Sequence, residues 1–325
     1  MTRNPLLAVL TVLLALSLPW VLSAQDRPPA ATPADPAKAE KQLKAGNYKD
    51  AYDLFSRLAL NAAAEPNKVG EYLAKGVTCL RSLNRADEID EFREKVIAVH
   101  AGNWRLLWAA AQGYAADEHY GYIVAGKFYR GYHRGQGRWV GSYERDRIRA
   151  LQLMEQAAAK SAGEPEKAEV GRFWFDFAQA LLGNRGYYEA WRLQYKSDLT
   201  VLPDYDEGGR YGYYGGSARG APVNEDGTPV YHKLPKSWKE AATDGERWRW
   251  CLMQAAELDP ARAMEARFVF AQFLQNQFGV ATMAEYRWFF GRQAEADETR
   301  KDESGTYAMH TLGEDETIAK LANGI

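Results

Sequence analysis

The stretch with the most specific spacing for chemistry is residues 121–128, which read Gly-Tyr-Ile-Val-Ala-Gly-Lys-Phe. This is the spacing of a phosphate-binding P-loop, in which backbone amides and a lysine surround the phosphates and a following Ser or Thr holds magnesium. Phe128 stands where that hydroxyl is required. The match therefore indicates a coincidence of glycines, and the sequence predicts no nucleotide cofactor.

Other catalytic and metal-binding patterns are also missing from the sequence. Residues 215–219 do not read Gly-x-Ser-x-Gly, so Ser217 is not placed as a nucleophile. The five histidines are scattered, with no His-Glu-x-x-His and no Cys-x-x-Cys to supply closely spaced metal ligands. We therefore expect a chain without catalytic residues, metal or cofactor.

Two acidic loops leave two narrower alternatives open. Residues 204–207 and 224–226 carry carboxylate and amide oxygens that calcium uses if the loops meet, although tight turns need the same residue types. Alternatively, Glu207 facing Glu225 or Asp226 across a cleft would form an acid–base pair. A glycosidase needs such a pair about 5 Å or about 6.5 to 9.5 Å apart. The alternative function is therefore a glycan-binding or glycan-processing helical toroid.

Aromatic residues make up 13% of the chain, which is the most informative feature of its composition. Trp104 and Trp108 are spaced i and i+4, which suits packing between helices. The tyrosines and arginines of two glycine-rich segments are harder to bury, because loops run over surfaces. Since both residue types are enriched at interface hot spots, they form the candidate surface for a protein partner, with the filling of a helical groove as the alternative. That surface comprises Tyr129, Arg130, Tyr132, Arg134, Arg210, Tyr211, Tyr213 and Tyr214.

The N-terminal residues predict export. Arg3 precedes a short apolar run, which is followed by Pro19 and the small residues Ser23 and Ala24, as in a cleavable signal peptide over residues 1–24. The apolar run is shorter than the roughly 20 residues of a spanning helix, so we expect membrane contact only during export. Residues 25–36 are rich in proline and alanine and predict a flexible tether. The mature chain is expected in the periplasm or outside the cell.

The remaining residues, 37–325, predict one all-α domain. Apolar residues recur at helical spacing, first in a helix pair around the Gly-Asn-Tyr turn at residues 46–48 and then in a second pair around the turn at Asn84. Two segments interrupt the pattern, residues 120–141 and 203–236, and the second contains a small β-hairpin at residues 222–230. Later helices are expected at residues 103–117, 142–161, 165–182, 244–258, 261–278 and 313–323.

The net charge excludes one class of partner, and the cysteine positions bear on disulfide formation. The formal net charge is -2, so no basic field exists to concentrate nucleic acid. Cys79 and Cys251 are far apart and each lies in an apolar helical pattern, which favours two buried thiols over a disulfide.

The helix pairs resemble the tetratricopeptide repeat. The second helix of that repeat opens with Gly-Asn/Asp-Tyr and continues with Ala and then an aromatic residue, which Gly46, Asn47, Tyr48, Ala51 and Phe55 match. The segments 255–260 and 186–190 are further matches, whereas Glu88 departs from the pattern. The resemblance implies a helix-turn-helix solenoid with two Gly/Tyr-rich insertions.

Stretches at residues 181–187, 244–251 and 312–319 resemble the N-terminal region of large exported bacterial alpha-2-macroglobulin-like proteins. That family traps proteases, but neither cysteine lies in its Cys-Gly-Glu-Gln thioester motif, so only a scaffold role is implied. Apolar residues of the last expected helix form a stripe ready to receive a further helix. We therefore expect a non-catalytic exported scaffold that contacts a protein partner or later domains of the same polypeptide, as the N-terminal part of a longer protein.

Overall fold

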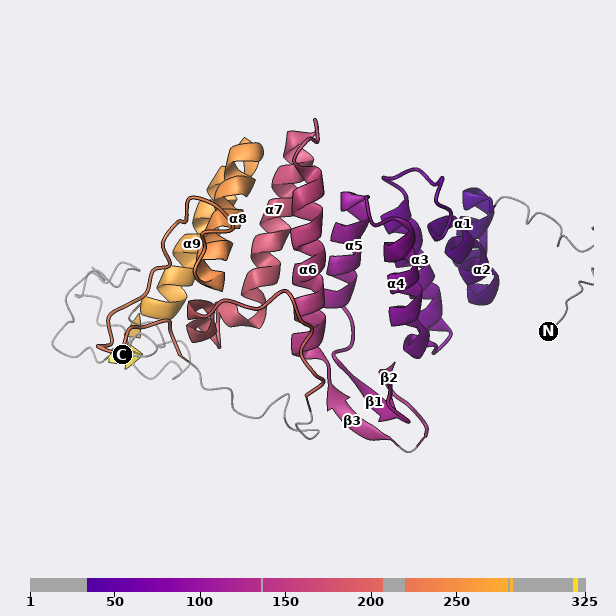
Figure 1. Cartoon of the computed structure of the whole chain (residues 1–325), viewed down its shortest axis with the longest axis horizontal. Coiled ribbons are helices and arrows are strands. Elements are labelled where there is room, and N and C mark those ends of the chain that lie inside the picture. Colours follow the sequence, from indigo (N-terminus) through magenta and orange to yellow (C-terminus); the bar gives the residue numbers. More distant parts are fainter. Residues whose placement is uncertain (1–33, 136, 207–219, 280, 283–317, 321–325) are drawn as a thin grey trace, which may run out of the picture. The chain divides into compact units, whose positions relative to one another are not determined.

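The computed structural model describes residues 34–135, 137–206, 220–279, 281–282 and 318–320. The chain divides into two compact units, residues 1–33 and 34–325, and every described residue belongs to the second. Within the described residues the fold is mostly helical, with nine α-helices and a small three-stranded sheet (Figure 1). The expected signal peptide lies outside the described residues, and so does most of the expected tether.

The first half of the domain contains five helices, each packed against a neighbour in sequence. Asp35 caps the first helix by accepting a hydrogen bond from the amide of Ala37, so the helix takes up the last residue of the expected tether. The expected turns are confirmed: Gly46 and Asn84 both have positive φ angles, +75° and +55°, and each reverses the chain between helices. These helices are α1 (Pro36–Lys44), α2 (Tyr48–Ala59), α3 (Val69–Ser82), α4 (Ile89–Val99) and α5 (Trp104–Ala115).

The second half contains the remaining four helices. Glycine ends α7, where Gly183 has a φ of +45°. Thr243 caps α8 by accepting from the amide of Glu246, and Asp244 is the first helical residue. These helices are α6 (Tyr143–Ser161), α7 (Lys167–Leu182), α8 (Asp244–Leu258) and α9 (Ala263–Phe278).

The expected insertion at residues 120–141 forms an antiparallel sheet between α5 and α6. Its strands are β1 (Tyr120–Val124), β2 (Lys127–Arg130) and β3 (Arg138–Gly141), in the order β2-β1-β3. The P-loop-like residues lie in the β1–β2 hairpin, where Val124 pairs with Lys127, so they do not connect a strand to a helix. In the second insertion, a single antiparallel bridge joins Val223 to Pro229 around the expected turn.

One large apolar core runs through α3 to α9, and a smaller one joins α1 and α2 to Cys79 of α3. The expected aromatic packing is confirmed, because Trp104 and Trp108 stack at 6.0 Å between ring centroids and both meet Phe173 of α7 edge-on. Both cysteines are buried and free, as expected. Within the described residues, no helix combines the length and apolar character needed to cross a membrane.

The helix expected at residues 313–323 is wrong where the structure describes it. Residues Ile318–Lys320 form strand β5, which pairs antiparallel with β4 (Ala281–Thr282). Apolar spacing over so short a stretch does not distinguish the two states, and pairing with a distant strand overrides local helix propensity. The rest of that segment lies outside the described residues.

Candidate functional site

Arg130 is the first correction to the expected partner-binding surface, because its side chain is buried. The residue is 4% exposed and its guanidinium donates to both carboxylate oxygens of Asp146 at 2.8 Å. It also donates to Asp90 at 3.0 Å and to the backbone oxygen of Glu118 at 2.7 Å. Arg130 is the last residue of β2 and points toward the helices, so it anchors the sheet on α4 and α6.

The buried charges around Arg130 form one connected group, which we call the Arg130 cluster. Arg93 lies 2.7 Å from Asp117, and Ser142 and His119 both contact Oδ2 of Asp146, at 2.7 Å and 3.0 Å. Burial alone raises the pKa of Asp146, but the hydrogen bonds from Arg130 and His119 outweigh it and hold that pKa below its usual range. The cluster comprises Asp90, Arg93, Asp117, His119, Arg130, Ser142 and Asp146.

A second buried group, the Asp244 cluster, joins α8 to α6 and to the segment after α7. Asp244 is fully buried and accepts from Arg147 at 3.1 Å, from Arg247 at 3.0 Å and from the backbone amide of Ser197 at 3.0 Å. Although burial raises the pKa of Asp244, the hydrogen bonds from Ser197 and the positive charge of Arg147 lower it overall. Sequence reasoning did not identify this cluster.

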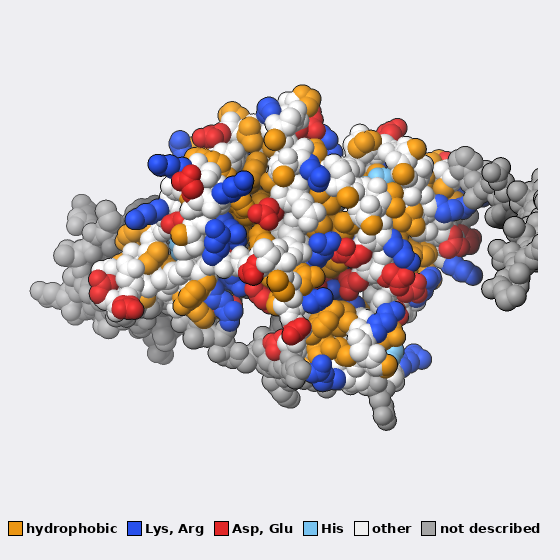
Figure 2. Space-filling model, in the orientation of Figure 1, with side chains coloured by type: hydrophobic (Ala, Val, Ile, Leu, Met, Phe, Trp, Pro, Cys, Tyr) orange, Lys and Arg blue, Asp and Glu red, His pale blue; other side chains and the backbone are white. Residues whose placement is uncertain are grey.

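The outer part of the sheet carries exposed and half-buried residues, which we call the sheet tip: Lys127, Tyr129, Tyr132, His133 and Arg134. Tyr132 is 76% exposed. Tyr129 stacks on His133 with 4.8 Å between ring centroids, and the Lys127 ammonium lies 5.2 Å from the centre of the Tyr129 ring. Figure 2 shows hydrophobic side chains beside Lys and Arg over the sheet, at the bottom of the view. The other predicted residues, Arg210, Tyr211, Tyr213 and Tyr214, lie outside the described residues.

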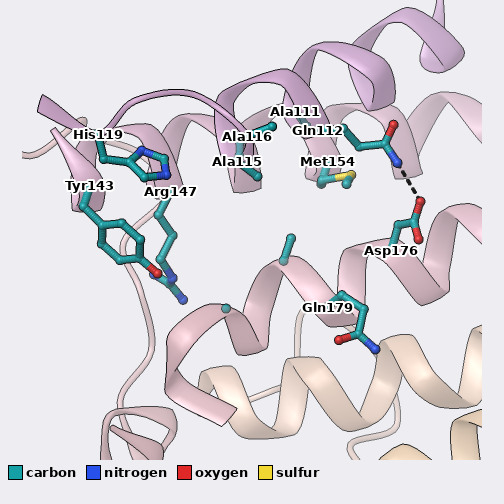
Figure 3. Close-up of a pocket in the computed structure, with 13 residues that line it drawn as sticks. Ala111, Gln112, Ala115, Ala116, His119, Tyr143, Arg147, Met154, Asp176 and Gln179 are labelled. Carbon is teal, nitrogen blue, oxygen red and sulfur yellow. Dashed lines mark hydrogen bonds between the residues drawn. The ribbon is translucent and has the colours of Figure 1, made fainter. Parts of the chain in front are cut away.

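A cavity of about 550 Å³ lies between α5, α6 and α7, and we call it the α5–α7 groove. Small apolar side chains dominate it: Ala150 and Met154 of α6 form a buried base, and α5 and α7 contribute further alanines. Polar side chains gather at two places along it, as Figure 3 shows. The lining residues are Ala111, Gln112, Ala115, Ala116, His119, Tyr143, Arg147, Ala150, Met154, Asp176, Gln179, Ala180 and Gly183.

The first polar place is Asp176, which bridges α7 to α5. Its Oδ2 accepts from the Trp108 indole at 3.1 Å and from the Gln112 amide at 2.8 Å (Figure 3). Burial raises the pKa of this carboxyl, and that effect exceeds the lowering caused by the Trp108 hydrogen bond and by the more distant charge of Arg262. No Lys or Arg of the described residues lies within 4.0 Å of it, so the carboxylate has no ion-pair partner there.

The second polar place consists of His119, Tyr143 and Arg147. The His119 ring meets Tyr143 edge-on at 5.1 Å, and its Nδ1 is held by Asp146. Ionised Asp146 can only accept, so Nδ1 of His119 donates this hydrogen bond. Arg147 is 7% exposed, and its Nε has no hydrogen-bond partner in the described part of the chain.

The arrangement around His119 does not form a nucleophilic triad. The Ser142 hydroxyl donates to Asp146 and not to the imidazole, whereas a Ser-His-Asp site requires a hydroxyl hydrogen-bonded to the histidine. Burial raises the pKa of both cysteine thiols, which keeps them protonated and unreactive. Among the described residues, no group of three or more His, Cys, Asp or Glu side chains is arranged to hold a metal ion.

The acidic loops are only partly described. Asp226 accepts from the amide and hydroxyl of Thr228 at 3.0 Å and 2.7 Å, as turn-forming aspartates do. Glu207, the other half of the glycosidase-type pair, lies outside the described residues, so the distance from it to Glu225 or Asp226 is not part of the structure.

Comparison with known proteins adds no relative: no family model, no curated protein and no solved structure matches this chain.

Sequence reasoning missed the groove because alanines carry no chemical signal. The sequence did contain a signal for the two buried clusters, since Asp146, Arg147 and Asp244 are charged residues within helical apolar patterns. Charged side chains are almost never fully buried unless they are paired. A charged residue on the apolar face of an expected helix therefore indicates a buried ion pair.

Proposed function

We propose that the chain is exported and that its helical body is a non-catalytic scaffold, which contacts a protein partner or other domains of the same polypeptide. The proposal includes a tetratricopeptide-like arrangement of helix pairs, as in the large alpha-2-macroglobulin-like proteins that the sequence resembles. The observation that carries it is the anchoring of the sheet by Arg130, because this leaves an aromatic and basic tip exposed on a fixed base.

The composition of the sheet tip supports a protein partner. Tyrosine offers a large, rigid contact area at low entropic cost, and arginine and tyrosine are the residues that most often dominate interface energies. Tyr132 and Arg134 are both exposed, and the stacking of Tyr129 on His133 reduces the freedom that binding would otherwise remove.

The anchoring also supports the scaffold role. Arg130 joins a strand to two helices through ion pairs. In the pair with Asp146, both side chains are buried. A sheet fixed in this way can transmit an orientation from the helices to whatever binds its tip, since the base cannot rotate without breaking buried charge pairs.

Site-specific photo-crosslinking in cells that export the chain tests this proposal. A photo-reactive amino acid is placed at position 132 and, as a control, at position 187, where Tyr187 is 53% exposed and outside the sheet. We expect a crosslinked species of one defined mass from position 132 that disappears when Arg134→Glu is added. Equal crosslinking from both positions, or none from position 132, contradicts the proposal.

A further inference from the structure

We propose that the α5–α7 groove binds a small amphipathic primary amine, with its ammonium group on Asp176 and its hydrocarbon body over the alanines and Met154. This inference concerns a different place from the sheet tip and does not depend on the scaffold function. It assigns to the groove a ligand class that the chemistry of its walls selects.

Asp176 differs from the other buried acids in having no arginine beside it among the described residues. Asp90, Asp117, Asp146 and Asp244 each lie within 4.0 Å of at least one arginine. Asp176 instead accepts two neutral N–H groups, both on Oδ2, and no described residue donates to its Oδ1. A half-buried carboxylate with one oxygen unused and no cation beside it is complementary to an ammonium group.

The groove is long enough, and apolar enough, to hold a hydrocarbon chain. The lining residues of α6 extend from Tyr143 to Met154, which at the helical rise corresponds to about 16 Å. Ala115 and Ala116 at the end of α5 are exposed and Ala180 of α7 is half-buried, so a hydrocarbon chain lying against them removes apolar surface from water. The volume of about 550 Å³ falls in the range of small-molecule sites.

The end of the groove at His119, opposite Asp176, indicates which group the other terminus of the ligand carries. His119 is held by Asp146 through Nδ1, and no described residue bonds to its Nε2. A hydroxyl group suits this nitrogen, because a hydroxyl can both donate and accept a hydrogen bond. Arg147 also lies at this end, but its guanidinium is paired with Glu144 and Asp244, so an acid there would compete with two carboxylates for it.

Two matched probes, 8-amino-1-octanol and 8-hydroxyoctanoic acid, test the proposal because they share a chain and a hydroxyl but carry opposite charges. Their binding to the full chain is measured by isothermal titration calorimetry at pH 7. We expect one amine per chain and no binding of the acid. Asp176→Asn should weaken the amine at least tenfold, because it removes the charge and keeps an acceptor for Trp108 and Gln112.

Glu155→Gln is the matched control, since Glu155 of α6 also accepts an indole N–H, from Trp238 at 2.8 Å, but lies outside the groove. It should leave amine binding unchanged, and circular dichroism should show both variants folded. The proposal is overturned if the amine does not bind at millimolar concentration, if the acid binds as tightly, or if both variants lose binding equally. Tighter binding of a lysine-containing peptide than of the amino-alcohol would also overturn it, by making the groove a protein-docking site.

Discussion

The Arg130 cluster and the α5–α7 groove share His119, but they differ in how their carboxylates are paired. In the cluster each acid has an arginine close by, and Asp146 receives hydrogen bonds from three side chains. In the groove Asp176 has no cation within 4.0 Å among the described residues. The carboxylates of the cluster are all paired with arginines, even though Arg93 Nη2 and Asp117 Oδ2 meet only as an ion pair without hydrogen-bond geometry, whereas Asp176 in the groove has no such cation in the described part of the chain.

This difference in pairing indicates that the two regions have different roles. A buried charge with all its partners present holds elements in one arrangement, and removing one partner leaves the other uncompensated. A carboxylate that lacks a cation raises the free energy of the folded state, and such a cost often marks a functional position. The cluster should therefore govern stability, and the groove should govern ligand binding.

The largest expected effect comes from Arg130→Met. This substitution removes the cation between Asp90 and Asp146 while keeping a long apolar side chain. Asp90 keeps Arg93 at 3.5 Å, but the buried Asp146 loses its arginine, which costs about 3–5 kcal/mol of the free energy of unfolding. Urea denaturation at pH 7 measures it.

Lys127→Met is the control for that experiment, because Lys127 lies on the same strand but is exposed. Its effect should stay within about 0.5 kcal/mol, as for most surface substitutions. A cost below about 1 kcal/mol for Arg130→Met would show that the cluster does not anchor the sheet.

A second prediction concerns His232, a buried histidine outside both regions. No carboxylate of the described residues stabilises its charge. It is 4% exposed, and burial together with the Arg249 charge lowers its pKa from 6.5 to about 4. The folded state then binds fewer protons than the unfolded state between these values, so stability rises with pH across that window. The contribution is present above pH 6.5 and is lost as pH falls toward 4, and it amounts to about 3 kcal/mol.

His232→Asn tests this prediction, since Asn tolerates the backbone φ of +50° at this position. The difference in unfolding free energy between wild type and variant should decrease by about 3 kcal/mol from pH 7 to pH 4. A difference that does not change with pH would show that His232 is protonated in the folded chain at pH 4.

Sequence reasoning located most helices because their apolar spacing extends over several turns. It placed the Trp104–Trp108 stack, the turns at Gly46 and Asn84 and the two buried thiols correctly. It failed where the result depends on distant partners. Arg130 was expected on the surface but is buried, and Ile318 was expected in a helix but lies in a strand. Both predictions failed because strand pairing and register are set by residues elsewhere in the chain.

The candidate site was less predictable than the fold for a related reason. Tyr132 and Arg134 are exposed, as their glycine-rich segment suggested. The groove, however, is produced by the spacing between three helices, and alanine positions in a sequence do not report that spacing. The signal that Asp176 lacks a cation exists only when the positions of all neighbouring arginines are known.

The smallest expected effect is a gain in stability from Asp176→Asn. Because burial raises the pKa of Asp176 above 3.8, the folded state binds more protons than the unfolded state just above that pH. Wild-type stability therefore decreases as pH rises through this window, and ionised Asp176 destabilises the fold at pH 7. Asparagine removes that cost and keeps an oxygen that accepts from Trp108 and Gln112. The carboxyl is only partly buried, so solvent screening limits the gain to less than about 1 kcal/mol. Urea unfolding of wild type and variant at pH 7 and pH 4 measures it, and the gain should be present at pH 7 and smaller at pH 4. Glu155→Gln, which changes a similar indole-bonded acid, should give no gain, and a loss of stability in Asp176→Asn at pH 7 would mean that the negative charge has a structural partner.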